Sequence, residues 1–313
     1  MTKAFVFPGQ GSQSVGMGKV MADNFAVARQ VFEEVDDALN EKFSQIIFEG
    51  PEDTLMLTEN GQPAIMATSM AVFRVLQQEC GLNLKQSAKF VAGHSLGEYS
   101  ALCAAESLNL SDTARLLRLR GKAMQKAVAV GEGAMAALLG LDIDTVTNIA
   151  QQATENEICA VANDNSPGQV VISGHNTAVA RACELAKAAG AKRAVPLAVS
   201  APFHCALMQP AADAMAEALS AIELKAPVVP VVSNISVEAV TNPETIRALL
   251  VQQVTGRVRW TETIQYMKNH GVEEVVELGN GKVLTGLVRR IDKELATKNI
   301  SVPEDLDSFA KTA

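Results

Sequence analysis

An apolar run leads into a serine between two glycines at Phe90-Val91-Ala92-Gly93-His94-Ser95-Leu96-Gly97. The first three residues predict a short buried strand, and the residues after the serine predict a helix that continues through Ala105. A GxSxG sequence between a strand and a helix is typical of the turn that lifts a serine hydroxyl above an α/β sheet. The start of the helix would also direct backbone N–H groups at a developing oxyanion. We therefore expect Ser95 to be a nucleophile; the alternative is a structural turn, because five-residue matches also occur by chance.

The composition indicates a globular protein that binds neither nucleic acid nor membrane. Of the 313 residues 48% are hydrophobic and 20% charged, and the net charge is −8. General nucleic-acid binding depends on clustered cations, so an acidic chain is a poor candidate for it. The N-terminal apolar run is too short for a signal peptide, and no stretch approaches the roughly 18 apolar residues of a membrane span. The five cysteines have no regular spacing, which is typical of reduced thiols, and we expect a cytoplasmic protein.

The middle of the chain predicts a small domain of its own. Strands are predicted at 134–139, 158–162, 169–173 and 193–197, and helices at 144–154 and 177–189. This β-α-β-β-α-β order is the ferredoxin-like pattern. We predict an α/β fold in which residues 1–128 and 198–313 form a large domain and residues 129–197 form an inserted ferredoxin-like small domain.

The ends of two helices in the large domain are predicted from local signals. Gln62-Pro63 is expected to begin a helix that Gly81 ends, and Ser111-Asp112 is expected to cap a helix that runs to about Val128. Residues beyond about Ser301 are expected to form a surface tail.

Only four histidines are available as a base for Ser95. His94 is its direct neighbour, and adjacent residues on a tight turn point apart, so His94 is expected to support the site. His175 is expected to cap a helix, and His270 to lie at an exposed helix end. His204 lies where the chain returns from the inserted domain, and domain junctions form clefts. We predict that His204 is the base; the alternative is a core or capping histidine.

The predicted helix after Ser111 carries an arginine on its apolar face. At 100° per residue, Arg120 falls in the middle of the face formed by Thr113, Leu116, Leu117, Met124 and Ala127. A buried charge without a partner is costly, so Arg120 needs an anion. The anion is either the carboxylate of a substrate, which a guanidinium binds with two hydrogen bonds, or a structural ion-pair partner. A separate basic stripe formed by Arg115, Arg118, Lys122 and Lys126 is expected to be solvated.

Two further kinds of site receive no support. The stretch Gly279-Asn280-Gly281-Lys282-Val283-Leu284 lacks the third glycine of GxGxxG and the Ser or Thr of a phosphate-binding loop. No cluster of His, Cys or carboxylate residues has metal-ligand spacing. We therefore expect no nucleotide cofactor and no metal.

Five segments, in their order and spacing, resemble the malonyl-CoA:acyl carrier protein transacylase family over about residues 3–290. They are Phe7-Pro8-Gly9-Gln10-Gly11-Ser12-Gln13, Gly93 to Ala101, Arg120-Gly121, Asn165-Ser166-Pro167-Gly168-Gln169 and Ala201-Pro202-Phe203-His204. One departure is Gly279-Asn280-Gly281, where the family commonly has Gly-Pro-Gly, and this loop lies outside the chemistry.

The resemblance implies a hydrolase-like large domain, a ferredoxin-like small domain and an active site between them. Matched motif by motif, Ser95 is the acylated nucleophile, His204 its base and Arg120 the clamp on the malonyl carboxylate. The backbone N–H groups of Gln10 and Leu96 would form the oxyanion hole.

Four more residues are assigned roles, either from the resemblance or from their position next to His204 in the sequence. In this family a backbone carbonyl, not an aspartate, orients the histidine, and Gln253 matches that position less securely. His94 and Asn165 are expected to line the site. Phe203 precedes the base and is expected to crowd a 2-methyl substituent on the acyl group.

The reaction that the resemblance implies is ping-pong transfer of a malonyl group from malonyl-CoA to holo acyl carrier protein, in fatty acid biosynthesis, without a metal or redox cofactor. Three alternatives stay open at this point. They are a stand-alone acyltransferase for a polyketide or polyunsaturated lipid synthase, a serine thioesterase or hydrolase that releases free acid, and a non-catalytic binding module.

Overall fold

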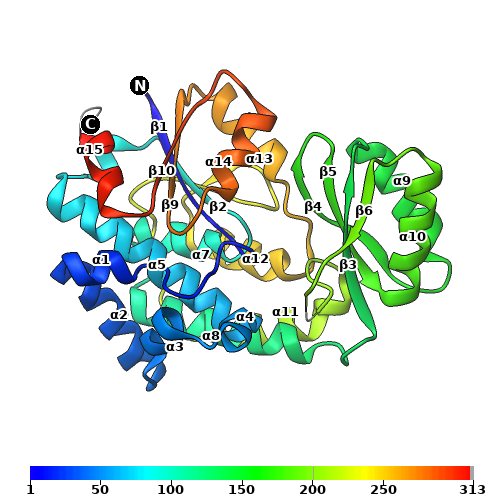
Figure 1. The fold of residues 1–313 in the computed structure, drawn as a ribbon, viewed down its shortest axis with the longest axis horizontal. Coiled ribbons are helices and arrows are strands. Elements are labelled where there is room, and N and C mark those ends of the chain that lie inside the picture. The colour runs from blue at the N-terminus through cyan, green and yellow to red at the C-terminus, as the bar shows by residue number, and fades with distance from the viewer. Residues whose placement is uncertain (200, 311–313) are drawn as a thin grey trace.

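The protein is built on two separate β-sheets, as Figure 1 shows. The structure, a computed structural model, describes residues 1–199 and 201–310. A six-stranded sheet has the order β10-β9-β1-β2-β7-β8, and a four-stranded sheet has the order β4-β5-β3-β6. The strands of the larger sheet are β1 (Lys3–Phe7), β2 (Phe90–Gly93), β7 (Val231–Val232), β8 (Ala239–Val240), β9 (Glu274–Leu278) and β10 (Ala296–Ile300).

Strand β1 lies in the centre of the larger sheet and is buried along its whole length. It pairs in parallel with β2 on one side and β9 on the other. Strands buried on both faces are apolar throughout, as this one largely is. Successive residues point to opposite faces, so Phe5 and Phe7 join one hydrophobic cluster while Ala4 and Val6 join another.

Helices cover both faces of the larger sheet. The cluster around Val6 includes residues of α13 and α14, and Figure 1 shows α2, α5 and α8 on the opposite side. The first set of helices is α1 (Lys19–Asn24), α2 (Ala26–Leu39), α3 (Phe43–Glu49), α4 (Glu52–Met56), α5 (Thr58–Glu79), α6 (Leu84–Ser87), α7 (Gly97–Ala104) and α8 (Leu110–Lys126). The later set is α11 (Gln209–Ser220), α12 (Pro243–Thr255), α13 (Trp260–Asn269), α14 (Val283–Ile291) and α15 (Leu306–Ala310), with short 3-10 turns at Ala206–Met208 and Pro303–Asp305.

The smaller sheet has the predicted ferredoxin-like arrangement. Its elements are β3 (Gly133–Leu139), α9 (Ile143–Thr154), β4 (Cys159–Ser166), β5 (Gln169–His175), α10 (Asn176–Ala188) and β6 (Arg193–Pro196). All strand pairs are antiparallel, and α9 and α10 pack on the sheet around a hydrophobic cluster of its own. A parallel bridge between Asn163 and Val258 joins this sheet to the segment before α13.

Three local predictions are wrong. Helix α5 begins at Thr58 and contains Pro63, because packing of nearly the whole helix outweighs the one backbone hydrogen bond that proline removes. The cap of α8 is Asn109, whose Oδ1 accepts a 2.7 Å hydrogen bond from the Asp112 amide. The expected surface tail instead returns to the core, where the buried Phe309 ring lies 6.2 Å from the Phe5 ring.

The expectation of a solvated basic stripe on α8 fails at Arg118. Its guanidinium is buried, lies 4.6 Å from the centre of the Phe43 ring, and donates to Asn60 and to Glu41. A helical wheel separates faces, but it does not show that neighbouring helices cover part of a polar face.

Candidate active site

Ser95 lies on a sharp turn between β2 and α7, as the GxSxG sequence predicts. Its φ angle is 53°, in the left-handed region that residues other than glycine rarely adopt. The two flanking glycines are required by space. A Cβ at Gly93 would lie 1.9 Å from the Gly97 carbonyl, and a Cβ at Gly97 would lie 2.2 Å from the Phe7 oxygen.

Asn234 holds this turn in place, and the sequence analysis missed it. Its Oδ1 accepts a 2.8 Å hydrogen bond from the Ser95 amide, and its Nδ2 donates a 2.8 Å bond to the Gly93 oxygen. One side chain therefore holds together the two ends of the Gly93–Ser95 segment that leads into the strained residue.

Ser95 and His204 meet although 109 residues separate them. The Ser95 Oγ lies 2.8 Å from His204 Nε2. His204 Nδ1 lies 2.9 Å from the Gln253 carbonyl oxygen and 3.1 Å from that of Gly256. Carbonyl oxygens only accept, so Nδ1 carries the proton and Nε2 is free to accept the hydroxyl proton. Burial, followed by the charge of Arg120, lowers the pKa of His204 to about 3.

Arg120 lies beside this pair and is only 1% exposed. Its Nη2 donates to Ser95 Oγ at 3.2 Å and to Gln253 Oε1 at 3.0 Å, and its Nη1 donates to Gln62 Oε1 at 2.8 Å. Among the described residues no carboxylate lies within ion-pair distance of it, so its hydrogen-bond partners are neutral. Burial lowers the pKa of Arg120, which reflects the cost of keeping this charge out of water.

Gln253 and Glu98 connect the parts of this site. The Gln253 side chain donates to the Ser95 carbonyl at 3.0 Å and to Glu98 Oε2 at 2.8 Å, while its oxygen accepts from Arg120. Glu98 is 2% exposed and also accepts a hydrogen bond from the Asn234 amide. Burial raises the pKa of Glu98 to about 7. Neither Glu98 nor Gln62 was predicted as a site residue from the sequence, although Glu98 directly follows the GxSxG residues.

These groups open onto a cavity of about 330 Å³ between the two sheets. Four predicted residues besides the central three border it, namely Gln10, His94, Leu96 and Phe203. The remaining wall is largely apolar and includes Met56, Met124, Met135, Leu197 and Val199.

Asn165 and Gln253 do not line the cavity but bond to residues that do. Asn165 Oδ1 lies 2.8 Å from His94 Nε2, and Asn163 borders the cavity in its place. Burial lowers the pKa of His94, whose ring lies 5.6 Å from the ring of Trp260. The structure thus brings eight of the nine predicted residues into direct contact with the cavity or with the Ser95, His204 and Arg120 group, and Asn165 reaches it through His94.

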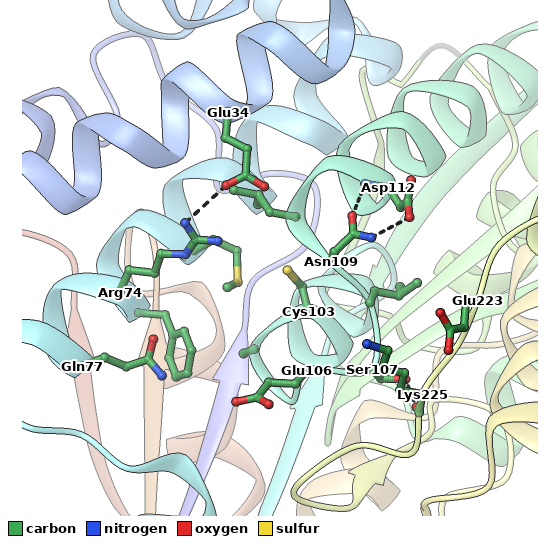
Figure 2. A pocket seen from close by; sticks show the side chains of 15 residues that line it. Glu34, Arg74, Gln77, Cys103, Glu106, Ser107, Asn109, Asp112, Glu223 and Lys225 are labelled. Carbon is green, nitrogen blue, oxygen red and sulfur yellow. Dashed lines mark hydrogen bonds and ion pairs between the residues drawn. The ribbon is translucent and has the colours of Figure 1, made fainter.

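A second cavity, of about 440 Å³, lies among α2, α5, α7 and α8 and the loop near Lys225, as Figure 2 shows. It contains an ion pair between Arg74 and Glu34 at 3.3 Å. Its one thiol belongs to Cys103, and burial raises the pKa of that thiol to about 12, so it is a poor nucleophile. The described residues that line it include no histidine to pair with a serine, and we place the chemistry at Ser95.

Two structural features are absent from residues 1–199 and 201–310, namely a metal-binding cluster and a membrane-spanning helix. No group of three or more His, Cys, Asp or Glu side chains is arranged to hold a metal ion there. In the same ranges no helix combines the length and apolar character needed to cross a bilayer.

Comparison with known proteins identifies the family. The acyl transferase domain family matches residues 4–304. The malonyl CoA-acyl carrier protein transacylase of Escherichia coli K12 is 47% identical over 300 residues, which is 96% of each chain. The enzyme of that name from Bacillus subtilis 168 is 45% identical over 99% of this chain and 96% of its own. The chain belongs to the malonyl-CoA:acyl carrier protein transacylase family.

Solved structures agree with this membership. The acyl-carrier-protein S-malonyltransferase of Bartonella henselae is 59% identical and superposes with a TM-score of 0.97 over 99% of both chains. A malonyl-transacylase solved in complex with a type II polyketide synthase acyl carrier protein is 44% identical, with a TM-score of 0.96 over the whole of both chains. The prediction of a hydrolase-like α/β fold with a ferredoxin-like part is confirmed.

Proposed function

We propose that this protein transfers the malonyl group from malonyl-CoA to the phosphopantetheine thiol of holo acyl carrier protein, in fatty acid biosynthesis. The observation that carries the proposal is the 2.8 Å hydrogen bond between Ser95 and His204 beside the buried Arg120 in one cavity. Family membership and the names of the relatives support the same acyl group and the same two carriers.

In the first half-reaction His204 Nε2 takes the proton of Ser95 as the hydroxyl oxygen attacks the thioester carbonyl carbon. The backbone N–H groups of Gln10 and Leu96 receive the oxyanion that forms, a role supported by the place of both residues at the cavity. The carbon–sulfur bond then breaks, and the coenzyme A sulfur leaves with the proton that His204 returns. The thiol of the carrier protein reverses these steps on the Ser95 ester.

Arg120 provides the selection of the acyl group. A malonyl carboxylate offers two oxygens that match the guanidinium, whereas an acetyl group offers none. The neutral partners Gln62 and Gln253 leave the positive charge of Arg120 uncompensated by a direct ion pair, which supports an anionic ligand.

The proposed reaction takes no cofactor or metal. Ser95, His204 and Arg120 supply the nucleophile, the base and the anion-binding group, and the two thioesters have similar energy. The apolar wall of the cavity limits access of water, which would otherwise release free malonate.

We further propose that residues 129–197 form a separate small domain within a large domain of residues 1–128 and 198–313, which is supported by the separate hydrophobic cluster of the smaller sheet. A cytoplasmic location is supported by the five cysteines, all of them described and all unpaired.

A second candidate function is transfer of the malonyl group to the acyl carrier protein of a polyketide synthase. The 44% identical transacylase bound to a polyketide carrier protein favours it, and the chemistry at Ser95 would be unchanged. Comparing transfer rates to fatty-acid and polyketide carrier proteins distinguishes the two.

The test is the intact mass of the protein after mixing with malonyl-CoA, and again after addition of holo carrier protein. A malonyl adduct that is absent from Ser95→Ala and passes to the carrier is expected. An adduct on a cysteine would contradict the mechanism, and steady release of malonate without a carrier would indicate a hydrolase.

A further inference from the structure

Within the part of the chain that the structure describes, the base of this site has no anionic hydrogen-bond partner. Both hydrogen bonds of His204 Nδ1 go to backbone carbonyl oxygens, at 2.9 and 3.1 Å. Among the described residues no carboxylate bonds to this ring, which is 4% exposed. When His204 accepts the proton of Ser95 it becomes a buried imidazolium, and a buried cation is costly unless an anion lies nearby.

The charge closest to the base in this hydrogen-bonded group is a cation. Arg120 Nη2 donates to Ser95 Oγ at 3.2 Å, and the same oxygen lies 2.8 Å from His204 Nε2. A single oxygen atom therefore separates the guanidinium from the imidazole. Like charges at this separation disfavour protonation of the base, and the charge of Arg120 is the second cause, after burial, of the low pKa of His204.

The one carboxylate in this hydrogen-bonded group, Glu98, acts on the charge of Arg120 but bonds directly to neither Arg120 nor His204. Glu98 receives hydrogen bonds from Gln253 and Asn234, and the Gln253 amide stands between it and Arg120. Arg120 itself keeps an Nε atom without a hydrogen-bond partner. Since Arg120 also borders the cavity, its guanidinium is positioned to bind an anion there.

We propose that the carboxylate of the acyl group, once it is paired with Arg120, supplies the negative charge that the His204 imidazolium lacks. The proposal rests on the function proposed above, and it adds that the site selects acyl groups by the rate of proton transfer as well as by binding.

The direction of the effect follows from the charges. With malonyl bound, the carboxylate offsets the charge of Arg120, so His204 is a stronger base when the Ser95 proton moves to Nε2 and the Oγ–carbon bond forms. With acetyl bound, Arg120 has no carboxylate bonded to it, only Glu98 behind Gln253, and the same transfer is slower. A charge change of this kind moves a nearby pKa by about one to two units, and a partial proton transfer converts this into a rate change of about 3- to 10-fold.

Other titratable groups around His204 set the conditions of the test. These are His94 on the turn, Tyr99 and Glu98 on α7, and Arg120 on α8. A pH of 8 is above the pKa of Glu98, about 7, so Glu98 is mostly ionised. It is below the pKa of Tyr99, about 12, so Tyr99 is neutral, and burial, which lowers the pKa of His94, keeps that ring neutral as well. The charges of these groups then stay constant during the measurement.

The experiment supplies the acyl group and the carboxylate as two separate molecules, acetyl-CoA and formate. The single-turnover rate of acetylation of Ser95 is measured at saturating acetyl-CoA and pH 8, with increasing formate. Formamide, which has the same size and no charge, and chloride at equal ionic strength are the controls. We expect formate alone to raise the rate about 3- to 10-fold with saturation, and to leave the apparent affinity for acetyl-CoA largely unchanged.

Arg120→Met tests the route of the effect. In this variant formate should give no acceleration, whereas Arg118→Met, at the other buried arginine of the same helix, should keep it. A rate that stays flat or falls with formate in the unmodified protein overturns the proposal, as does an equal rise in Arg120→Met. If Arg120→Met does not fold, the comparison of formate with formamide still decides. Absence of any malonyl adduct on Ser95 would instead refute the proposed function.

Discussion

Replacing Arg120 by alanine should change the choice of substrate more than the stability of the fold. The variant removes three hydrogen bonds, two to the side-chain oxygens of Gln62 and Gln253 and one to Ser95. In the malonyl complex it also removes hydrogen bonds to the carboxylate, and charged bonds of this kind contribute about 1.5–3 kcal/mol each. Since about 1.4 kcal/mol corresponds to a factor of ten, kcat/KM for malonyl-CoA should fall at least ~10-fold.

The assay compares kcat/KM for malonyl-CoA and acetyl-CoA in the same preparation. Acetyl-CoA makes no use of the guanidinium, so its kcat/KM should be spared or improved in Arg120→Ala. Arg120→Lys should recover malonyl transfer only in part, because an ammonium group cannot form two parallel bonds to one carboxylate.

Arg118→Ala is the matched control for this substitution. It lies on the same helix and is also buried, but it contacts Asn60, Glu41 and Phe43 instead of the site. It should lower the melting temperature and leave the ratio of the two substrates unchanged. If Arg120→Ala instead loses activity with both substrates equally, with a lowered melting temperature, Arg120 serves the structure and does not select the acyl group.

Three further predictions concern the base, the acyl pocket and the buried carboxylate. His204→Ala should slow both acylation and carrier-dependent deacylation by ~10²–10⁴-fold, and an unchanged single-turnover acylation rate would remove it from the role of base. Phe203 is buried at the cavity, so malonyl-CoA should be preferred over methylmalonyl-CoA by the ~1–3 kcal/mol that one methyl group is worth, and equal kcat/KM values for the two thioesters would contradict this. Burial raises the pKa of Glu98 from 4.5 to about 7, so between these pH values the native state keeps a proton that the unfolded chain loses. The free energy of unfolding should therefore fall by roughly 1.4 kcal/mol for each pH unit between 4.5 and 7. Glu98→Gln should therefore gain stability relative to the unmodified protein between pH 4.5 and 7 in urea unfolding, and a constant difference would argue against the shift.

The sequence indicates the parts of the site that depend on local structure. A strand followed by GxSxG predicts the turn at Ser95 because only glycine fits on either side of it. The helical period places Arg120 on a buried face, since 100° per residue holds along the whole of α8. The strands and helices of the smaller sheet follow from alternating patterns and turn residues in the same way.

The parts that depend on contacts between distant segments were not predictable from local patterns. Asn234 reaches Ser95 across 139 residues and Gln253 reaches Glu98 across 155, and neither residue stands in a pattern that indicates a partner. The family resemblance suggested Gln253 only for its backbone carbonyl, whereas its side chain also bonds to Arg120, Ser95 and Glu98. The errors at Pro63, Arg118 and Phe309 have one cause, because packing against neighbouring elements outweighed local preference at each position.

The left-handed backbone of Ser95 means that the stability of the fold and the presence of the nucleophile favour different residues at this position. A non-glycine residue held at such a φ angle costs about 1–3 kcal/mol, and glycine would adopt it without that cost. Selection for a longer-lived fold alone would therefore replace the nucleophile by glycine. The Asn234 side chain, which bonds to the Gly93 oxygen and to the Ser95 amide, helps to hold the serine in this conformation. Mutations that weaken this clamp should allow the turn to relax, and the protein would lose activity before it loses its fold.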